Sequence, residues 1–176
     1  MFKSLYPTRY IDSSYSIDYE GLYQKGYRGI IFDIDNTLVP HGFPADERAI
    51  ELMKRLKEIG YRVLFLSNNK EARVKMFNDD VDCLYIFKAN KPGRQGFVKA
   101  MEKMGTDKDN TFLVGDQLFT DIWGANKAGI YSILVGQIGK KEEIQIVLKR
   151  ILEKIVLAVY KKKLKKGTLK EKEYGK

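Results

Sequence analysis

The stretch Arg28–Thr37, with the sequence RGIIFDIDNT, joins a short apolar run to two aspartates. Residues 28–32 predict a buried β-strand, because short apolar runs with β-branched and aromatic residues are typical of one. Asp33 and Asp35 follow directly and are two positions apart, so in extended backbone their side chains point to the same face. At the end of a strand both can approach one metal ion. The stretch therefore predicts a strand that ends in an acidic site.

The same pattern continues along residues 38–139, where apolar runs alternate with helical periodicity. Further strands are predicted over residues 61–66, 84–87, 111–114 and 130–135. Helices are predicted over residues 45–59, 72–77, 92–104 and 121–128. Strands that alternate with helices favour a parallel sheet covered by helices on both faces. We expect an α/β fold of the Rossmann-like, three-layer α/β/α kind, with about five strands.

Polar residues follow the predicted strands at the point where each one ends. In parallel sheets, ligands bind at this carboxyl edge. The first strand is followed by Asp33, Asp35 and Thr37; later ones by Ser67, Asn68 and Asn69, by Lys91, and by Asp116 and Asp121. The sequence thus predicts that its reactive side chains gather at one edge of the sheet.

Phosphoryl transfer is the chemistry that these residues can perform together. The acidic ones would repel one another unless a cation with oxygen ligands joined them, and Mg²⁺ suits a site that also holds phosphate. Asp33 can attack phosphorus once the metal and Lys91 neutralise the phosphate charge. Asp35 can protonate the leaving oxygen and then deprotonate the attacking water. Ser67 and the backbone amides after it can hold phosphoryl oxygens.

In order and position, these residues resemble the four motifs of the haloacid dehalogenase (HAD) superfamily. The motifs are Asp33–Thr37, Ser67, Lys91 and Gly115-Asp116 to Asp121. The resemblance implies Asp33 as phosphoryl acceptor, Asp35 as general acid and base, and Mg²⁺ bound by Asp33, the Asp35 carbonyl and Asp116, with support from Asp121. An acid at position 35 resembles the phosphatases of the superfamily. We also expect Thr37, Asn68 and Asn69 to contact the substrate.

The spacing of the motifs leaves no room for a cap domain. Caps of this superfamily are inserted between the first and second motifs or between the second and third. Residues 38–66 and 68–90 each hold only one predicted helix and one predicted strand. The site should be open, which suits a bulky or macromolecular substrate that supplies its own cover.

A closer resemblance extends beyond the four motifs. The stretches DIDNTLVP (33–40), LSNN (66–69), ANKP (89–92) and GDQLFTD (115–121) are similar to the YqeG-type subfamily, which is related to mitochondrial phosphatidylglycerophosphate phosphatases. This implies hydrolysis of phosphatidylglycerophosphate to phosphatidylglycerol. The sequence departs from the subfamily at His41, where an aromatic such as Trp is expected, and His41 is open to two interpretations, a catalytic aid or an ordinary loop side chain.

The positive charge is concentrated in the C-terminal part. Residues 140–176 carry 13 Lys and Arg against 5 Glu, a net charge of +8 out of +9 for the chain. We expect a phosphatase domain over residues 1–139 and a basic amphipathic helix and tail over residues 140–176. One helical face collects Val147, Leu148, Ile151, Leu152, Ile155 and Val159. This stripe either lies on an anionic membrane surface or packs on the domain, and the sequence favours neither.

The absence of membrane and export signals predicts where the protein is located. It has no apolar run of about 18 to 20 residues and no apolar leader, and its single cysteine, Cys83, fits a reducing compartment. We expect a cytoplasmic protein, peripheral on the inner face of the membrane.

A phosphatase for nucleic-acid ends or phosphoproteins is an alternative function, although no nucleic-acid module is recognisable. A receiver-like signalling domain is the non-enzyme alternative, but there the phosphorylated Asp follows a middle strand.

Overall fold

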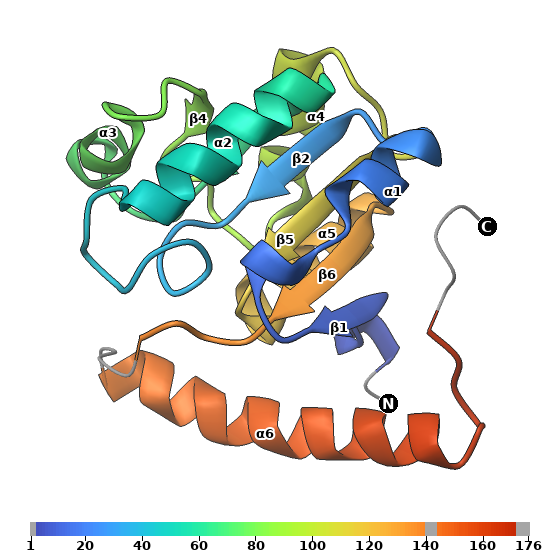
Figure 1. The fold of residues 1–176 in the computed structure, drawn as a ribbon. Coiled ribbons are helices and arrows are strands. Elements are labelled where there is room, and N and C mark those ends of the chain that lie inside the picture. The colour runs from blue at the N-terminus through green and yellow to red at the C-terminus, as the bar shows by residue number, and fades with distance from the viewer. Residues whose placement is uncertain (1–2, 140–143, 172–176) are drawn as a thin grey trace.

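The computed structural model describes residues 3–139 and 144–171, with side chains in the second range from residue 152 onward. A six-stranded sheet, parallel throughout, forms the middle layer (Figure 1). Its strands are β1 (Arg9–Ile11), β2 (Gly29–Phe32), β3 (Arg62–Leu66), β4 (Leu84–Ile86), β5 (Thr111–Gly115) and β6 (Tyr131–Val135). Their order across the sheet is β1-β6-β5-β2-β3-β4.

Helices cover both faces of this sheet. The first hydrophobic cluster includes residues of α1 (Tyr19–Gln24), α2 (Glu47–Ile59) and α3 (Glu71–Asn78), and the second includes residues of α4 (Arg94–Met104), α5 (Trp123–Ala128) and α6 (Ile144–Lys165). Successive side chains of a strand point to opposite faces. Accordingly Ile30 and Phe32 belong to the first cluster and Ile31 to the second. The predicted three-layer α/β/α fold is confirmed.

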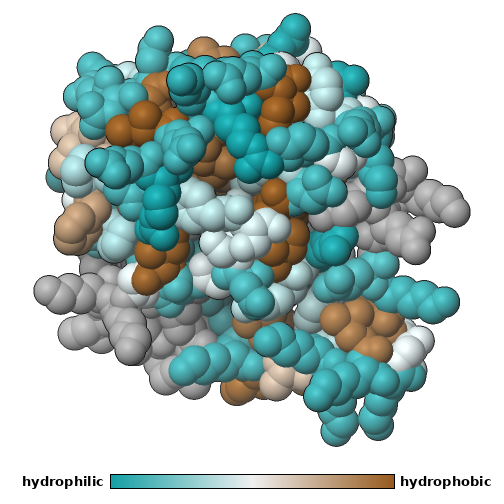
Figure 2. Space-filling model, in the orientation of Figure 1, coloured by the Kyte–Doolittle hydropathy of each residue, from teal (hydrophilic) through white to brown (hydrophobic). Residues whose placement is uncertain are grey.

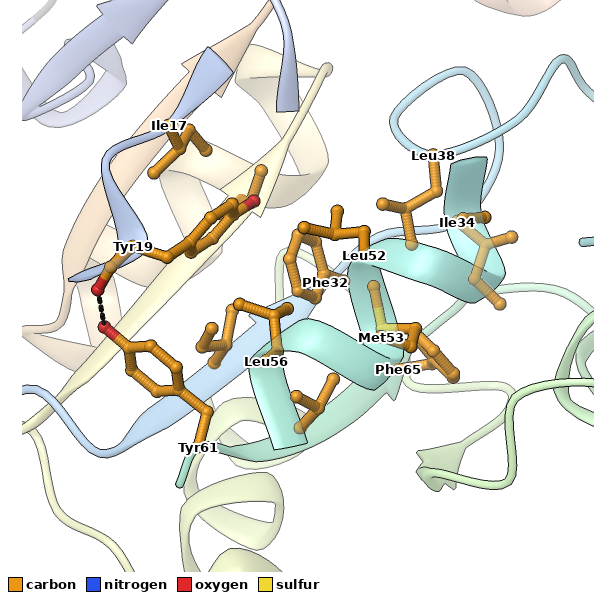
Figure 3. Packing of buried hydrophobic residues seen from close by; sticks show 14 of the residues in the cluster. Ile17, Tyr19, Phe32, Ile34, Leu38, Leu52, Met53, Leu56, Tyr61 and Phe65 are labelled. Atoms are coloured by element: carbon orange, nitrogen blue, oxygen red, sulfur yellow. Dashed lines mark hydrogen bonds between the residues drawn. The ribbon is translucent and has the colours of Figure 1, made fainter. Parts of the chain in front are cut away.

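The first cluster shows how α2 is fixed on the sheet. Leu52 and Met53 of this helix lie beside Phe32 of β2 in Figure 3. The Tyr61 hydroxyl, just before β3, donates to the Tyr19 carbonyl at 2.8 Å, so the one polar atom of this buried ring is satisfied. Ile34 and Leu38 of the β2–α2 connection belong to the same cluster, so the segment that carries the first motif is itself packed on the domain.

The sequence pattern predicts neither the strand β1 nor the helix α1 near the N-terminus. β1 has three partly exposed residues and becomes a strand by pairing with β6, with Arg9 aligned to Ile133. α1 has only six residues and begins at Asp18, whose carboxylate accepts the Gly21 N–H at 2.9 Å. Such short elements carry too few periods for a pattern to register, and tertiary contacts decide them.

The C-terminal helix α6 runs along the lower side of the molecule in Figure 1, as an amphipathic helix that the sequence predicted. Val156 and Tyr160 are buried in the second cluster, and the Tyr160 ring lies 5.4 Å from that of Tyr6. Leu152 and Ile155 of the predicted stripe are instead 53% and 55% exposed. The helix therefore packs through a second apolar face, which the stripe did not include. The stripe residues Val147, Leu148 and Ile151 lie outside the described side chains.

Candidate active site

The two innermost strand ends place the acidic motifs side by side. β2 lies between β5 and β3, and Phe32 is aligned with both Val114 and Phe65. Asp33, Asp116 and Ser67 follow these three aligned positions within two residues. The loop that leaves β2 lies at the arrowhead end of that strand in Figure 1. The order of the sheet thus builds the site at the carboxyl edge, where parallel sheets bind ligands.

Three carboxylates form the core of the site. One oxygen each of Asp33, Asp116 and Asp121 lies within 4.8 Å of the others, and all three residues are buried. A π-helical turn, Leu118–Ile122, carries Asp121 back toward the strand end. Gly115 makes this return possible, because a Cβ there would lie 2.7 Å from the Cβ of Asp121.

Lys91 supplies the positive charge that faces these acids. Its Nζ lies 2.6 Å from Asp33 Oδ1 and 2.7 Å from Asp121 Oδ1. Burial alone would lower the pKa of this ammonium, but Asp121 and Asp33 raise the pKa above its ordinary value. Asn68 fixes the lysine backbone, since its side chain accepts the Lys91 N–H at 2.7 Å and donates to the Lys91 carbonyl at 3.0 Å.

The electrostatics of the cluster fit a divalent cation. Burial raises the pKa of Asp33 to about 7, an effect that Lys91 opposes and that Asp121 and Asp35 increase. Three buried carboxylates lie together in this cluster, and the Lys91 ammonium pairs with two of them, Asp33 and Asp121. Carboxylate oxygens are the ligands that Mg²⁺ prefers, and a cation among them would keep Asp33 ionised. The donor set and its spacing are therefore suited to the magnesium ion that the sequence implied.

Asp35 points to a different part of the site. Its Oδ1 accepts the Gly42 N–H at 2.8 Å and the Arg73 Nε and Nη2 groups at 3.2 and 2.8 Å, and its Oδ2 accepts the Asn69 amide at 2.6 Å. His41 Nδ1 is 3.8 Å from the same Oδ1. The carboxylate is thus separate from the acidic cluster, which leaves the backbone carbonyl as the metal ligand that the resemblance implies for this residue.

The remaining predicted side chains lie at the site, where they form hydrogen bonds with its carboxylates and with loop backbone groups. Thr37 is fully buried, and its hydroxyl donates to Asp116 Oδ1 at 3.3 Å. Ser67 Oγ accepts the Asn69 N–H at 3.1 Å, and Asp121 Oδ2 accepts the Gln117 N–H at 3.1 Å. The substrate contacts expected of Thr37, Asn68 and Asn69 stay predictions.

Two residues near the site were not found from the sequence, Arg73 and Glu153. Arg73 lies in the first turn of α3, and this helix begins at the edge of the sheet where β3 ends. The only signal for it in the sequence was a basic residue early in the helix that follows the Ser67 motif. Glu153 of α6 is a buried acid whose carboxylate accepts the Leu118 N–H. No local pattern distinguishes it from a solvent-exposed helical glutamate.

Comparisons with known proteins agree with this geometry. Residues 88–154 match the family described as HAD-hyrolase-like. The probable phosphatase YqeG of Bacillus subtilis is 35% identical over 162 residues, which cover 92% of this chain and 94% of that protein. The chloroplastic/mitochondrial phosphatidylglycerophosphate phosphatase 1 of Arabidopsis thaliana is 30% identical over 165 residues, which cover 86% of this chain and 46% of that protein.

Solved structures show the same fold at low sequence identity. The cobalt-bound deoxy-D-mannose-octulosonate 8-phosphate phosphatase of Haemophilus influenzae superimposes with a TM-score of 0.52 at 16% identity, over 63% of this chain and 69% of that one. This likeness concerns the fold alone. The match to YqeG spans nearly the full length of both proteins. Together with the acids and the lysine at the strand ends, it shows that the chain belongs to the HAD superfamily and is a phosphatase similar to YqeG.

Proposed function

We propose that this phosphatase is magnesium-dependent, works through an aspartyl-phosphate on Asp33, and dephosphorylates phosphatidylglycerophosphate to phosphatidylglycerol. The approach of the Asp33, Asp116 and Asp121 carboxylates to within 4.8 Å carries the proposal. A divalent cation would relieve the repulsion among acids so close and buried, and Asp33 is the acid at the end of the central strand β2. When bound, Mg²⁺ would supply charge neutralisation at the transferring phosphoryl group.

Each proposed step uses one residue of the site. An Asp33 oxygen attacks phosphorus and the bond to the leaving oxygen breaks, while Asp35, which enters this step as the protonated acid, gives that oxygen its proton and becomes a carboxylate. A water then attacks the phosphorus of the aspartyl-phosphate and gives a proton to Asp35, which releases inorganic phosphate and restores both acids. Lys91 offsets charge on the phosphoryl oxygens. Ser67 lies at the end of β3, where it can hold another of them.

The residues proposed as metal ligands are supported by other contacts of the same site. Asp33, Asp116 and Asp121 offer carboxylate oxygens, and Asp35 offers its carbonyl. Thr37 orients Asp116 through the hydrogen bond from its hydroxyl. Partners of this kind tune a metal site by fixing the direction of its ligands.

A lipid substrate is supported by one of the relatives and by the surface of α6. The Arabidopsis relative is named for phosphatidylglycerophosphate. On α6, the exposed Leu152 and Ile155 stand on the helix face that continues through Val159 to Lys162 and Lys166. Along its lower edge, where α6 runs, Figure 2 shows hydrophobic residues among hydrophilic ones. An apolar face with lysines around it is the surface that binds anionic bilayers.

The proposed place of action is the cytoplasmic face of the membrane, with residues 140–176 as the peripheral contact and residues 1–139 as the part that carries the chemistry. Within the described residues, no helix has the length and apolarity to cross a bilayer. The anionic lipids of the cytoplasmic leaflet attract clustered lysines.

Side-by-side phosphate release tests the substrate. The purified protein with Mg²⁺ is given vesicles that contain phosphatidylglycerophosphate, nucleoside monophosphates, 3′-phosphorylated oligonucleotides and a phosphopeptide at equal phosphate concentration. We expect the lipid to be hydrolysed with the highest kcat/KM. Faster release from an oligonucleotide or peptide would replace the lipid by that substrate and leave the phosphatase chemistry intact.

A further inference from the structure

The guanidinium of Arg73 reaches from α3 into the site beside Asp35. Its Nε and Nη2 lie 3.2 and 2.8 Å from Asp35 Oδ1, while 14% of its side chain is exposed. Its third nitrogen, Nη1, is buried and has no hydrogen-bond partner among the described residues. Buried polar groups without a partner are rare and costly. This guanidinium therefore keeps donor capacity that its contact with Asp35 does not use.

Asp35 does not need this arginine to satisfy its oxygens. The Gly42 N–H already donates to Oδ1 and the Asn69 amide to Oδ2. Two such hydrogen bonds are sufficient to orient a carboxylate. Arg73 adds a full charge and a planar fork of donors, the arrangement that binds phosphate and carboxylate groups through two parallel hydrogen bonds.

The position of Arg73 corresponds to the leaving-group side of the reaction, and this step rests on the proposed function. Phosphoryl transfer is roughly in line, so the leaving oxygen lies across the phosphorus from Asp33, within reach of Asp35. A second group on the leaving alcohol, a few bonds from the leaving oxygen, would then lie near the residues that contact Asp35. The Arg73 guanidinium contacts Asp35, whereas the Lys91 ammonium contacts Asp33.

We propose that Arg73 is a specificity-determining residue that binds a second anionic group on the leaving alcohol. The site would then select phosphomonoesters whose leaving alcohol carries a phosphodiester or a comparable anion a few atoms away. Phosphatidylglycerophosphate has this form, because one glycerol separates its terminal monoester from its phosphodiester. In an open site without a cap, such a contact from the domain itself distinguishes substrates.

Two soluble esters test the inference on the full chain with Mg²⁺. Glycerophosphoglycerol phosphate carries the second anion, and glycerol 3-phosphate does not. The wild type should prefer the first by at least about tenfold in kcat/KM, the size expected of a charge-assisted hydrogen bond. Arg73→Gln should bring this ratio close to one, mainly by raising KM for the first ester. Arg73→Lys should keep part of the preference, and the matched control Lys75→Gln, on the exposed side of α3, should keep all of it.

The outcomes separate this inference from the proposed function. Equal losses on both esters in Arg73→Gln, with the ratio preserved, would overturn the inference and leave Arg73 as a residue that positions Asp35. A wild type without preference, or without activity on either ester, would overturn it too. If the protein hydrolyses the lipid in vesicles but Arg73→Gln leaves the kcat/KM ratio of the two esters unchanged, the role of Arg73 is wrong and the proposed function stands. If Arg73→Gln changes this ratio but the protein does not hydrolyse the lipid, the lipid substrate is wrong and the role of Arg73 stands.

Discussion

The carboxylate of Glu153 accepts a hydrogen bond from the backbone N–H of Leu118 at 2.8 Å. Glu153 belongs to α6, and Leu118 begins the π-helical turn that carries Asp121. A carboxylate at the first N–H groups of a helical turn stabilises that turn by hydrogen bonding and by its charge. The C-terminal helix is therefore tied to the acidic site, and a truncation after residue 139 would disturb both.

Replacing Glu153 should weaken the fold and the metal site together. In Glu153→Ala the Leu118 N–H loses its charged acceptor, and we expect about 1.5–3 kcal/mol lower free energy of unfolding. The looser turn should also reduce the apparent affinity for Mg²⁺. Urea unfolding and a magnesium titration of activity measure the two effects. Glu58→Ala, on the exposed side of α2, is the matched control, and equal behaviour of the two variants would contradict the proposed link.

Asp33→Asn should abolish turnover while the protein stays folded. The amide cannot act as a nucleophile, and its loss of charge reduces the repulsion among the buried acids. Phosphate release should fall to the background, with an unchanged far-UV circular dichroism spectrum. Asp109→Asn, at an exposed acid that pairs with Lys108, should retain activity. Turnover by folded Asp33→Asn would remove the central claim of the mechanism.

The stability of the metal-free protein should fall as the pH rises through about 7. An unfolded Asp has a pKa near 3.9, whereas burial raises that of Asp33 to about 7 in the fold. Between these values the folded state binds more protons than the unfolded state, so the free energy of unfolding decreases with pH. Mg²⁺ requires ionised ligands, and its stabilising effect should grow over the same range.

Urea unfolding between about pH 5 and 8, with chelator or with Mg²⁺, measures both trends. Ca²⁺ should also stabilise the fold but support little turnover, because its longer and looser coordination misplaces the phosphoryl group. Identical stability with chelator and with Mg²⁺ at pH 8 would show that the acidic cluster binds no metal.

Thr37 should act through Asp116. Thr37→Val keeps the shape of the buried side chain but removes the hydroxyl that donates to Asp116 Oδ1. We expect about 10- to 100-fold weaker apparent Mg²⁺ affinity, the usual effect of losing a partner of a metal ligand. Thr37→Ser retains the hydroxyl and should behave nearly as the wild type. A raised substrate KM at saturating Mg²⁺, with metal affinity unchanged, would instead support the predicted substrate contact.

The central strands could be predicted because each is a continuous apolar run buried on both faces. Residues 29–32 and 112–114 have this pattern, and they lie in β2 and β5. β1 gave no such signal, since its three residues are partly exposed and their strand geometry comes from β6. Long-range pairing of this kind is absent from any local pattern.

The acidic site could be predicted for a related reason. Asp33, Lys91 and Asp116 each follow a strand, so the fold class alone brings them to one edge. Arg73 and Glu153 lie inside helices, where a charged residue is usually solvated. Their direction depends on how α3 and α6 pack on the sheet, which helical periodicity does not specify.

The exposed face of α6 can be changed without disturbing the residues through which the helix packs. Leu152→Gln with Ile155→Gln removes exposed apolar side chains without touching Val156 or Tyr160, which are buried. Binding to anionic vesicles should weaken, because the apolar area that enters the interface is lost. Ile50→Gln, at an exposed position of α2, is the control for polarity. Sedimentation with vesicles of increasing anionic lipid content measures the effect.

The lysines of the tail contribute the salt-dependent part of this binding. Reversing Lys162, Lys165 and Lys166 to Glu should cost more than about 1 kcal/mol per residue, since each lysine near the surface attracts by about that amount and each glutamate repels. Lys161 is left in place, because its Nζ lies 4.8 Å from the centre of the Tyr10 ring and its loss would disturb packing. High salt should reproduce part of the loss. Hydrolysis of soluble esters should survive, since none of these side chains lies at the acidic site. A triple variant that binds anionic vesicles as tightly as the wild type would show that α6 is no membrane contact, and the lipid substrate would then rest on the Arabidopsis relative alone.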